Sequence, residues 1–557
     1  MPNPTFEIGL VGAGAISAGA YTAGVVDFLV QALDAWYAAK DRGDAGVPTH
    51  DVKLRVFSGA SAGGIAAALA TSYLGTDQPP VTTLAQGNAN DGKNRLFDSW
   101  VDAIDISRLL QTDDLQQQNG DVVSLLDGSV LQTIADRNLV APPRTAPRRY
   151  VDENFHVFLT LTNLRGVPYS FTVSSGGTTT QYTMLLHGDY DRFVVSTAPQ
   201  PAQPDRFSLT WGDFTAGSKT LDRLKLAALA TSAFPIGLPP RDLHHTIPAT
   251  PPDYYSERIL GSNGAFVVPD WGNAVRPFRY DFRCVDGGVI DNEPFELARR
   301  VLSGGAALRN PPQGDKATRA VLLIDPFPNT DPFEPKYEAP NNLFKLAFSL
   351  VNALKNQSRF KPEELQLAAD PDYYSRFMIA PKRDASKHPI ACGSLGGFGG
   401  FLKRDFRVHD YFLGRRNAQQ FLRSHFALYE NNPLFDGMSA DLREHYCVRD
   451  DTGNVEMRDG QRLLPIVPLV GDALVECFPP DWPNYDARDL ARLEKQLRKR
   501  VGVLMDRLTH DFFSNKWPPV RWIARWVLGR KLDDVVEWAI GTVRADLTRH
   551  DGLMKSA

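Results

Sequence analysis

Apolar runs and helical segments alternate through the first 330 residues of the chain. Short runs rich in β-branched and aromatic residues predict strands, as in TFEIGLV at 5–11 and VKLRVFSG at 52–59. Each of these runs leads into a turn of glycine, alanine and serine, and then into an apolar segment with helical spacing. Further strand-like runs lie at 155–164, 168–173, 282–288 and 318–327. Strands that alternate with helices predict a largely parallel sheet covered by helices on both faces.

The alternation is interrupted twice and then ends. Residues 76–105 are rich in glycine, asparagine and aspartate, and residues 236–282 in proline and aromatic residues, so we expect surface excursions. Plain solvated loops are the favoured reading for most of their length, and walls of a cleft are the alternative. Beyond residue 330 the pattern changes to long amphipathic helical segments, at 341–360 and 486–513. The predicted organisation is an α/β domain at 1–330, with insertions near 76–105 and 236–282, and a mostly helical region at 331–557.

Composition and net charge limit the classes of protein to which this chain can belong. The chain has 557 residues, 43% of them hydrophobic, which suits a globular enzyme with a sizeable core. A net charge of −4 argues against nucleic acid as a partner. The cysteines are scattered, without a CxxC pair, which argues against a disulfide framework or a structural zinc site and suits a reducing compartment. We see no signal peptide and no apolar run near the roughly 20 residues of a spanning helix. We therefore expect a cytoplasmic protein that can touch the inner face of the membrane peripherally.

A G-x-S-x-G motif stands between a predicted strand and a predicted helix. It reads Gly59-Ala60-Ser61-Ala62-Gly63. In this context the motif is typical of a nucleophile elbow, whose small flanking residues let the chain turn sharply and expose the hydroxyl. The helix start behind Ser61 offers amides and positive dipole to a developing oxyanion. The alternative is a Gly/Ser turn without chemistry, because the motif arises often by chance.

The most distinctive acidic site downstream is Asp286, in CVDGGVIDNEP. It ends an apolar strand, and Gly287 and Gly288 let another backbone or a substrate approach its carboxylate. A partly desolvated aspartate held against a serine hydroxyl can take its proton without a histidine. The alternative is a turn aspartate that caps the next segment, because D-G is a common turn pair.

The first glycine turn, VGAGAISAGAY at 11–21, has two competing interpretations: it binds the pyrophosphate of a dinucleotide, or it binds the oxyanion of a transition state. Gly12 and Gly14 fit a dinucleotide fingerprint, but Ser17 occupies the third glycine position, and the second strand ends in SGAS without an acid for a ribose. We therefore predict no nucleotide. The turn is better suited to a transition-state oxyanion, which the same kind of backbone amides would hold.

Three segments in this order resemble the patatin-like phospholipases: GAGAISAGAYTAGV, GASAG and DGGVIDNEP. LAALATSAFPIGLPP and FLTLTNLRGVPYSF are also similar to family segments, so that the likeness spans about 5–330. The resemblance implies an α/β fold, with a three-layer α/β/α sheet and here a largely helical C-terminal part. It further implies a carboxylic ester hydrolase that acts on phospholipids or related acyl lipids and needs no metal or other cofactor. The implied site residues are the dyad Ser61 and Asp286, the oxyanion-hole residues Gly14, Ala15, Ile16 and Ala62, and the supporting glycines Gly12, Gly59, Gly63, Gly287 and Gly288.

One position departs from the family pattern. The family turn reads Gly-Gly-Gly-x-Arg/Lys-Gly, whereas Gly14 to Gly19 reads GAISAG, with Ala18 at the basic position. Backbone donors survive this change because they do not depend on side chains. The missing cation bears on the details of the oxyanion hole and on headgroup preference.

Other features have competing interpretations. His409, in FRVHDYFLGRRNAQQ, follows Asp286 in chain order and could complete a Ser-Asp-His triad, although a basic amphipathic helix packed on the core is the favoured reading. Arg415 and Arg416 could meet a phosphate headgroup. Trp522 and Trp526 share a helical face that suits either core packing or a membrane interface. The pair His244-His245, in a proline-rich stretch, is expected to be solvated rather than metal-binding. A non-catalytic lipid-binding protein on the same fold is the remaining alternative.

Overall fold

The computed structural model describes most of the chain. The described residues are 3–117, 122–144, 147–175, 178–261, 264–305, 309–328, 346, 349–350, 353–354, 356–359, 373–384, 386–513 and 518–555. Side chains are not described at 174–175 or within 509–531. The side chains of Trp522 and Trp526, and eleven of the twenty residues of the amphipathic segment 341–360, therefore lie outside the described part.

The described strands and helices follow the predicted alternation in the first half of the chain. The strands are β1 (Thr5–Gly12), β2 (Asp51–Gly59), β3 (Val151–Ser175), β4 (Thr178–Ser196), β5 (Phe207–Thr210), β6 (Arg241–Ile247), β7 (Ile259–Leu260), β8 (Phe266–Val267), β9 (Phe278–Asp286), β10 (Arg319–Ile324), β11 (Arg376–Ile379), β12 (Ala427–Tyr429), β13 (Met457–Arg458) and β14 (Gln461–Pro465). The α-helices are α1 (Gly19–Arg42), α2 (Ser61–Gly75), α3 (Leu84–Asn88), α4 (Arg95–Phe97), α5 (Ile106–Leu109), α6 (Asp113–Gln117), α7 (Ser129–Asn138), α8 (Lys219–Thr231), α9 (Phe295–Ser303), α12 (Arg404–Ser424), α13 (Ala440–Tyr446), α14 (Ala487–Phe513) and α15 (Pro518–Arg549). The short helical turns used below are η1 (Ile16–Ala18), η5 (Ala391–Gly397) and η6 (Gly399–Phe401).

A mixed sheet forms the centre of the fold. Its main path runs β11-β10-β1-β2-β3-β4-β5, and β9 joins β3 and carries β6 on its other side. The pairs from β11 to β3 are parallel, whereas β3 pairs antiparallel with β4 and with β9. The sheet is thus parallel where the strand–turn–helix pattern predicted it and mixed beyond β3, because β4 and β5 pair in parallel whereas β6 and β9 pair antiparallel.

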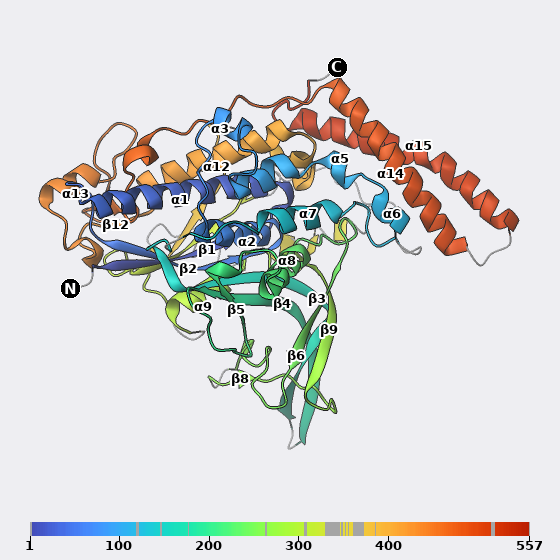
Figure 1. The fold of residues 1–557 in the computed structure, drawn as a ribbon, viewed down its shortest axis with the longest axis horizontal. Coiled ribbons are helices and arrows are strands. Elements are labelled where there is room, and N and C mark those ends of the chain that lie inside the picture. Colours follow the sequence, from blue (N-terminus) through green and yellow to red (C-terminus); the bar gives the residue numbers. More distant parts are fainter. Residues whose placement is uncertain are drawn as a thin grey trace.

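Helices cover both faces of this sheet (Figure 1). Alternate residues of β1 separate the two layers, because Leu10 lies in the large core under α1 and α2, whereas Val11 packs in the core under α9. Apolar residues fill both cores, so the parallel strands are buried from each side, as parallel sheets require. The three-layer α/β/α arrangement is confirmed.

The C-terminal part contributes directly to this body. β11 extends the sheet beyond β10, and α12 lies along α1. Two glycines allow the close helix contact, because a Cβ on Gly24 would collide with the carbonyl of Tyr411, and a Cβ on Gly414 with the carbonyl of Tyr21. In Figure 1, α14 and α15 run side by side and extend away from the sheet.

The two insertions contain regular structure. The first includes α3 and α4, and it buries Leu96, Phe97 and Trp100 against the main core. The second includes β6 to β8 and part of β9, which form a satellite core with the extended ends of β3 and β4. In Figure 1 this second group projects below the sheet. Both insertions are more buried than the composition of their sequences indicated.

One described helix passes the length and hydropathy criteria of a membrane span. It covers Ile16–Arg42, and 94% of its most apolar window is buried inside the protein. The sequence prediction that no segment approaches this length and hydropathy was wrong here. The burial is what a core helix shows, because α1 is enclosed between the sheet and α12.

Candidate active site

The register of β3 brings the two candidate side chains together. One edge of β3 pairs with β2, which places Leu159 opposite Gly59. Because β4 occupies the other edge, β9 joins β3 on the same side as β2, with Leu161 opposite Asp286. These positions on β3 are two residues apart, about 7 Å at the usual rise of a strand. Ser61, two residues after Gly59, therefore begins its helix beside the end of β9.

Ser61 has an unusual backbone conformation. It is the first residue of α2, and its φ is +51°. Positive φ is uncommon for residues other than glycine, and such strain is characteristic of functional turns and of nucleophile elbows. The Ser61 amide donates a hydrogen bond of 2.9 Å to the Oγ1 atom of Thr231, the buried last residue of α8. A contact from another helix therefore helps to hold the elbow.

The two side chains are in direct contact. The Ser61 Oγ atom donates to the Oδ2 atom of Asp286 at 2.6 Å, and the two residues are only 6% and 4% exposed. The Gly288 amide donates to Asp286 Oδ1 at 2.7 Å, and the Thr162 hydroxyl donates to the Asp286 carbonyl at 2.8 Å. These bonds orient the carboxylate so that one oxygen meets the serine hydroxyl in a largely desolvated place.

The predicted supporting glycines permit close backbone packing around this contact. A Cβ on Gly12 would lie 2.9 Å from the Gly63 Cα atom, and one on Gly63 would collide with the Gly12 carbonyl. A Cβ on Gly59 would likewise collide with the carbonyl of Gly63, and one on Gly287 with the carbonyl of Thr160. The first glycine turn and the elbow are therefore in backbone contact, which a larger residue at these positions would prevent.

The first glycine turn lies beside the serine. A Cβ on Gly14 would be 3.2 Å from the Ser61 Cβ atom. The Gly14 amide, however, donates to the Asn292 carbonyl at 3.1 Å, so it is already paired. The amides of Ala15 and Ile16 have no acceptor among the described residues, and the Ala62 amide lies in the first helical turn, where helices leave their donors unpaired. Of the residues predicted for an oxyanion hole, Ala15, Ile16 and Ala62 thus have amides without an acceptor in the described structure.

Comparison with known proteins identifies the family. A family model described as patatin-like phospholipase matches residues 10–299, just over half of the chain. The chain belongs to the patatin-like phospholipase family. A relative from Sinorhizobium fredii (strain NBRC 101917 / NGR234), named uncharacterized protein y4iI, is 38% identical over 550 residues. That similarity covers 91% of this chain and 76% of the relative, so it extends beyond the patatin-like segment into the C-terminal part.

The structure shows what surrounds Ala18, which stands in this turn where the family pattern has a basic residue. Ala18 is fully buried, so a long cationic side chain would not fit there without displacing its neighbours. Next to it, the buried Ser17 hydroxyl donates to the Gly397 carbonyl at 2.5 Å and accepts from the Gly400 amide at 3.0 Å. η5 and η6 therefore brace the turn from the C-terminal part. Sequence reasoning missed this contact, although the glycine-rich run GSLGGFGG at 393–400 was a signal for close packing.

A buried charged cluster also lies close to the dyad. Glu293, seven residues after Asp286, is paired at 3.0 Å with Arg359, which also pairs with the fully buried Asp325 at 2.7 Å. Burial raises the pKa of Glu293 to about 7, and Asp325 adds to the rise while Arg359 opposes it. The neighbouring Ser358 hydroxyl donates to the Gly288 carbonyl at 2.7 Å. Residues beyond 330 therefore support the segment that orients the carboxylate of Asp286, which the sequence did not reveal.

His409 lies in a different environment from the one a triad requires. It is buried in α12, where its Nδ1 atom lies 2.8 Å from the Asp410 carboxylate and its ring packs edge-on against Trp482. Asp410 also accepts the amides of Ala391 and Cys392. No described contact joins His409 to the serine or the aspartate of the site, so this pair supports η5 rather than the dyad.

The two neighbouring arginines do not form a headgroup site. Arg415 is fully buried and forms an ion pair with Asp27 of α1, so it cannot reach a phosphate at the surface. Arg416 donates to the Cys477 carbonyl at 3.2 Å and lies over the ring of Phe478. The suggestion of a phosphate-binding pair here was wrong, because the helical face that carries Arg415 packs against α1.

The prediction that His244 and His245 are both solvated was right for His244 and wrong for His245. The pair lies on β6, where alternation exposes His244 and buries His245. His245 is 3.2 Å from the Asp191 carboxylate and stacks on Tyr254 with ring centroids 3.8 Å apart, so its expected solvation was wrong. Within the described residues, no group of three or more histidine, cysteine, aspartate or glutamate side chains could hold a metal ion.

Proposed function

We propose that this patatin-like protein is a serine acyl hydrolase that cleaves fatty-acyl ester bonds of phospholipids or related lipids. The observation that carries the proposal is the 2.6 Å hydrogen bond from Ser61 to Asp286 at a positive-φ elbow. A serine hydroxyl is a weak nucleophile until a base removes its proton, and the carboxylate is placed to be that base. Family membership supports lipid esters as the substrate class.

The reaction follows from these contacts. As the Ser61 oxygen attacks the ester carbonyl carbon, its proton passes to Asp286, and the carbonyl oxygen becomes an oxyanion. Collapse of this intermediate breaks the bond to the alcohol, which leaves with the proton from Asp286, and the acyl group stays on Ser61. Water, deprotonated by the same carboxylate, then attacks the acyl carbon. The ester bond to Ser61 breaks, the Ser61 oxygen takes the proton back from Asp286, and the fatty acid is released.

The oxyanion needs donors that are already in place. The amides of Ala15, Ile16 and Ala62 are suited to this role, because they lie beside Ser61 without an acceptor among the described residues. Loss of a single oxyanion-hole donor typically costs about 3–4 kcal/mol of transition-state stabilisation. Nucleophile, base and charge stabilisation then all come from the protein, so the proposed reaction uses no metal or other cofactor.

We propose that the acyl chain enters at a small apolar cavity along α2. Ile65, one turn along α2 from Ser61, lines it together with Leu69, Trp100 and Leu131. Its volume is about 30 Å³, so a long chain would have to widen it on entry.

We place the activity in the cytoplasm at the membrane surface, where the four free and buried cysteines would remain reduced.

Hydrolysis by the purified full chain tests this function. We expect the wild type to hydrolyse p-nitrophenyl butyrate and phosphatidylcholine vesicles, and Ser61→Ala and Asp286→Asn to lose at least about 10³-fold in turnover. His409→Gln is the matched control and should keep most of its activity. A Ser61→Ala protein as fast as wild type would remove the serine mechanism. Loss of activity in His409→Gln alone would favour a triad, and an inactive wild type would favour a lipid-binding protein.

A further inference from the structure

A second and larger cavity lies away from the dyad, on the sheet face covered by α9. Its volume is about 360 Å³, within the range of small-molecule sites. The walls come from β2, β3, β4 and α9, and from the insertion between 254 and 266. Neither Ser61 nor Asp286 is among the residues that line it. It is therefore distinct from the site of the proposed hydrolysis.

The lining carries an excess of positive charge. Four arginines and two acids line the cavity, a formal excess of two positive charges: Arg55, Arg192, Arg258 and Arg300 against Asp205 and Glu257. The same field acts on a neighbouring imidazole. Burial, and then Arg192, Arg206 and Arg55, lower the pKa of His156 to about 3, so this lining residue stays neutral. Carboxylates pair with three of these arginines, so the positive charge that the wall offers to an anion is that of Arg300.

Three of the arginines are held in place by ion pairs. Arg192 pairs with Asp205, and Arg55 donates to the Glu7 carboxylate at 2.6 Å. Arg258 lies 3.2 Å from the Asp189 carboxylate. These side chains are therefore rigid parts of the wall and do not have to be ordered when a ligand binds.

Arg300, on α9, differs from the other three. It forms no ion pair with any residue that the structure describes, and its Nε atom is buried without a hydrogen-bond acceptor. The Nε atom of Arg192 is also buried without an acceptor in the described structure, whereas the Nε atom of Arg55 lies 3.2 Å from the Asp152 carboxylate. A buried donor that lacks an acceptor is destabilising, and an anion with several oxygens in this cavity would supply acceptors.

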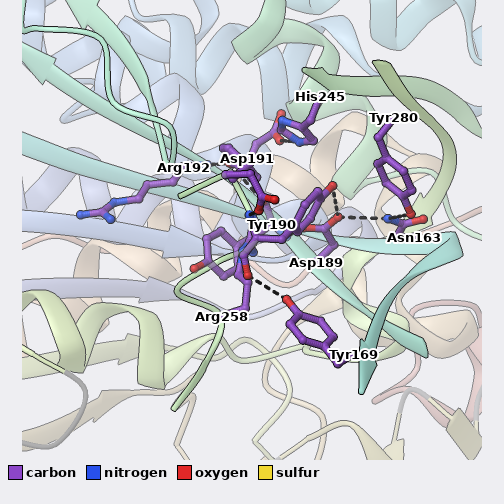
Figure 2. A network of polar contacts seen from close by, with 12 residues as sticks. Asn163, Tyr169, Asp189, Tyr190, Asp191, Arg192, His245, Arg258 and Tyr280 are labelled. Carbon is purple, nitrogen blue, oxygen red and sulfur yellow. Dashed lines mark hydrogen bonds and ion pairs between the residues drawn. The ribbon is translucent and has the colours of Figure 1, made fainter. Parts of the chain in front are cut away.

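Aromatic rings form the rest of the wall. Phe158 and Tyr190 contact each other with ring centroids 5.3 Å apart, and Phe266 lines the cavity with 39% of its surface exposed. The Arg258 guanidinium lies 3.3 Å over the Tyr190 ring, and the two side chains lie together in Figure 2. Phosphate and carboxylate groups accept paired hydrogen bonds from a guanidinium group, and a planar ring packs well against aromatic side chains.

We propose that this cavity binds a small phosphate monoester with a planar ring, its phosphate near Arg300 and its ring against Phe266. The inference does not rest on the proposed hydrolase activity. Calorimetry with phenyl phosphate as the probe tests it, with inorganic phosphate and phenol as partial probes. Wild type should bind phenyl phosphate more tightly than inorganic phosphate and should show no heat with phenol. Ser61→Ala should bind phenyl phosphate like wild type.

Two variants separate the contributions of charge and ring. Arg300→Gln should weaken the binding of phenyl phosphate by about 10-fold or more, because it removes charge-assisted hydrogen bonds. Phe266→Ala should lower the affinity for phenyl phosphate to that for inorganic phosphate. The control is Arg279→Gln, because Arg279 is exposed, pairs with Asp281 and does not line the cavity. A wild type without affinity for phenyl phosphate, or an Arg300→Gln protein that binds it like wild type, would overturn the proposal.

Discussion

The buried ion pair between α1 and α12 allows a quantitative test of how the C-terminal part supports the fold. Asp27 is fully buried, and it pairs with the equally buried Arg415. It also accepts the Tyr73 hydroxyl at 3.0 Å, the Asn94 amide at 2.7 Å and the Val81 backbone amide at 3.1 Å. One carboxylate thus joins α1, α2, the first insertion and α12.

The change Asp27→Asn removes the negative charge and leaves the shape almost unaltered. The new side-chain oxygen can still accept from Tyr73 and Asn94, whereas the Val81 amide loses its acceptor. The main loss comes from Arg415, which stays buried without a counter-charge. Breaking a buried pair in this way costs about 3–5 kcal/mol. Because proteins have only about 5–15 kcal/mol of stability, we expect a loss of about 4 kcal/mol to lower the urea midpoint clearly.

Urea unfolding followed by circular dichroism measures this loss. Replacing Arg415 with methionine in the Asp27→Asn background removes the uncompensated charge and should recover at least about 1 kcal/mol of the free energy of unfolding. Asp44→Asn, just after the same helix, is the control, because its pair with Arg42 is exposed and should be worth at most about 1 kcal/mol. If Asp27→Asn unfolded like Asp44→Asn, the reasoning that α12 is fixed to α1 by this pair would be refuted.

Two further predictions concern the surroundings of the dyad. Thr231→Val removes the acceptor of the Ser61 amide, so kcat on an acyl ester should fall by roughly 10-fold or more with little change in KM, whereas Thr231→Ser should restore it. Equal kcat in all three proteins would show that this bond does not hold the elbow. The Glu293 pKa of about 7 lies above its ordinary value of 4.5, so the folded state holds an extra proton between these values, and stability falls as pH rises through this window. Glu293→Gln cannot ionise and should therefore flatten the fall in Tm between pH 5 and 8, whereas parallel wild-type and variant curves would contradict the assignment.

Ser61 and Asp286 could be predicted from the sequence because the patterns that mark each of them are local. The strand, the G-x-S-x-G turn and the following helix are contiguous, and the turn needs small residues wherever the backbone packs closely, as at Gly63. Asp286 was marked by the strand before it and by the glycines after it. What the sequence could not give is the register of β3, which decides that these two segments meet.

The remaining features depend on contacts between distant parts of the chain. The buried Arg415 looked like a surface cation, because a helical pattern alone does not say which face meets α1. Gly14 was predicted as an amide donor, but the Asn292 carbonyl, 278 positions later, already accepts its N–H. The support of Ser17 by Gly397 and Gly400 likewise joins the two ends of the fold. Such pairings are set by tertiary packing, and no local pattern encodes them.

Active-site labelling tests the central claim most directly. The purified protein would be treated with a fluorophosphonate probe, and the modified peptide would be mapped by mass spectrometry. The account predicts a single adduct on Ser61, much slower labelling of Asp286→Asn, and none of Ser61→Ala. An adduct on another residue with Ser61 unmodified, or labelling of Asp286→Asn at the wild-type rate, would contradict the claim that Asp286 activates Ser61.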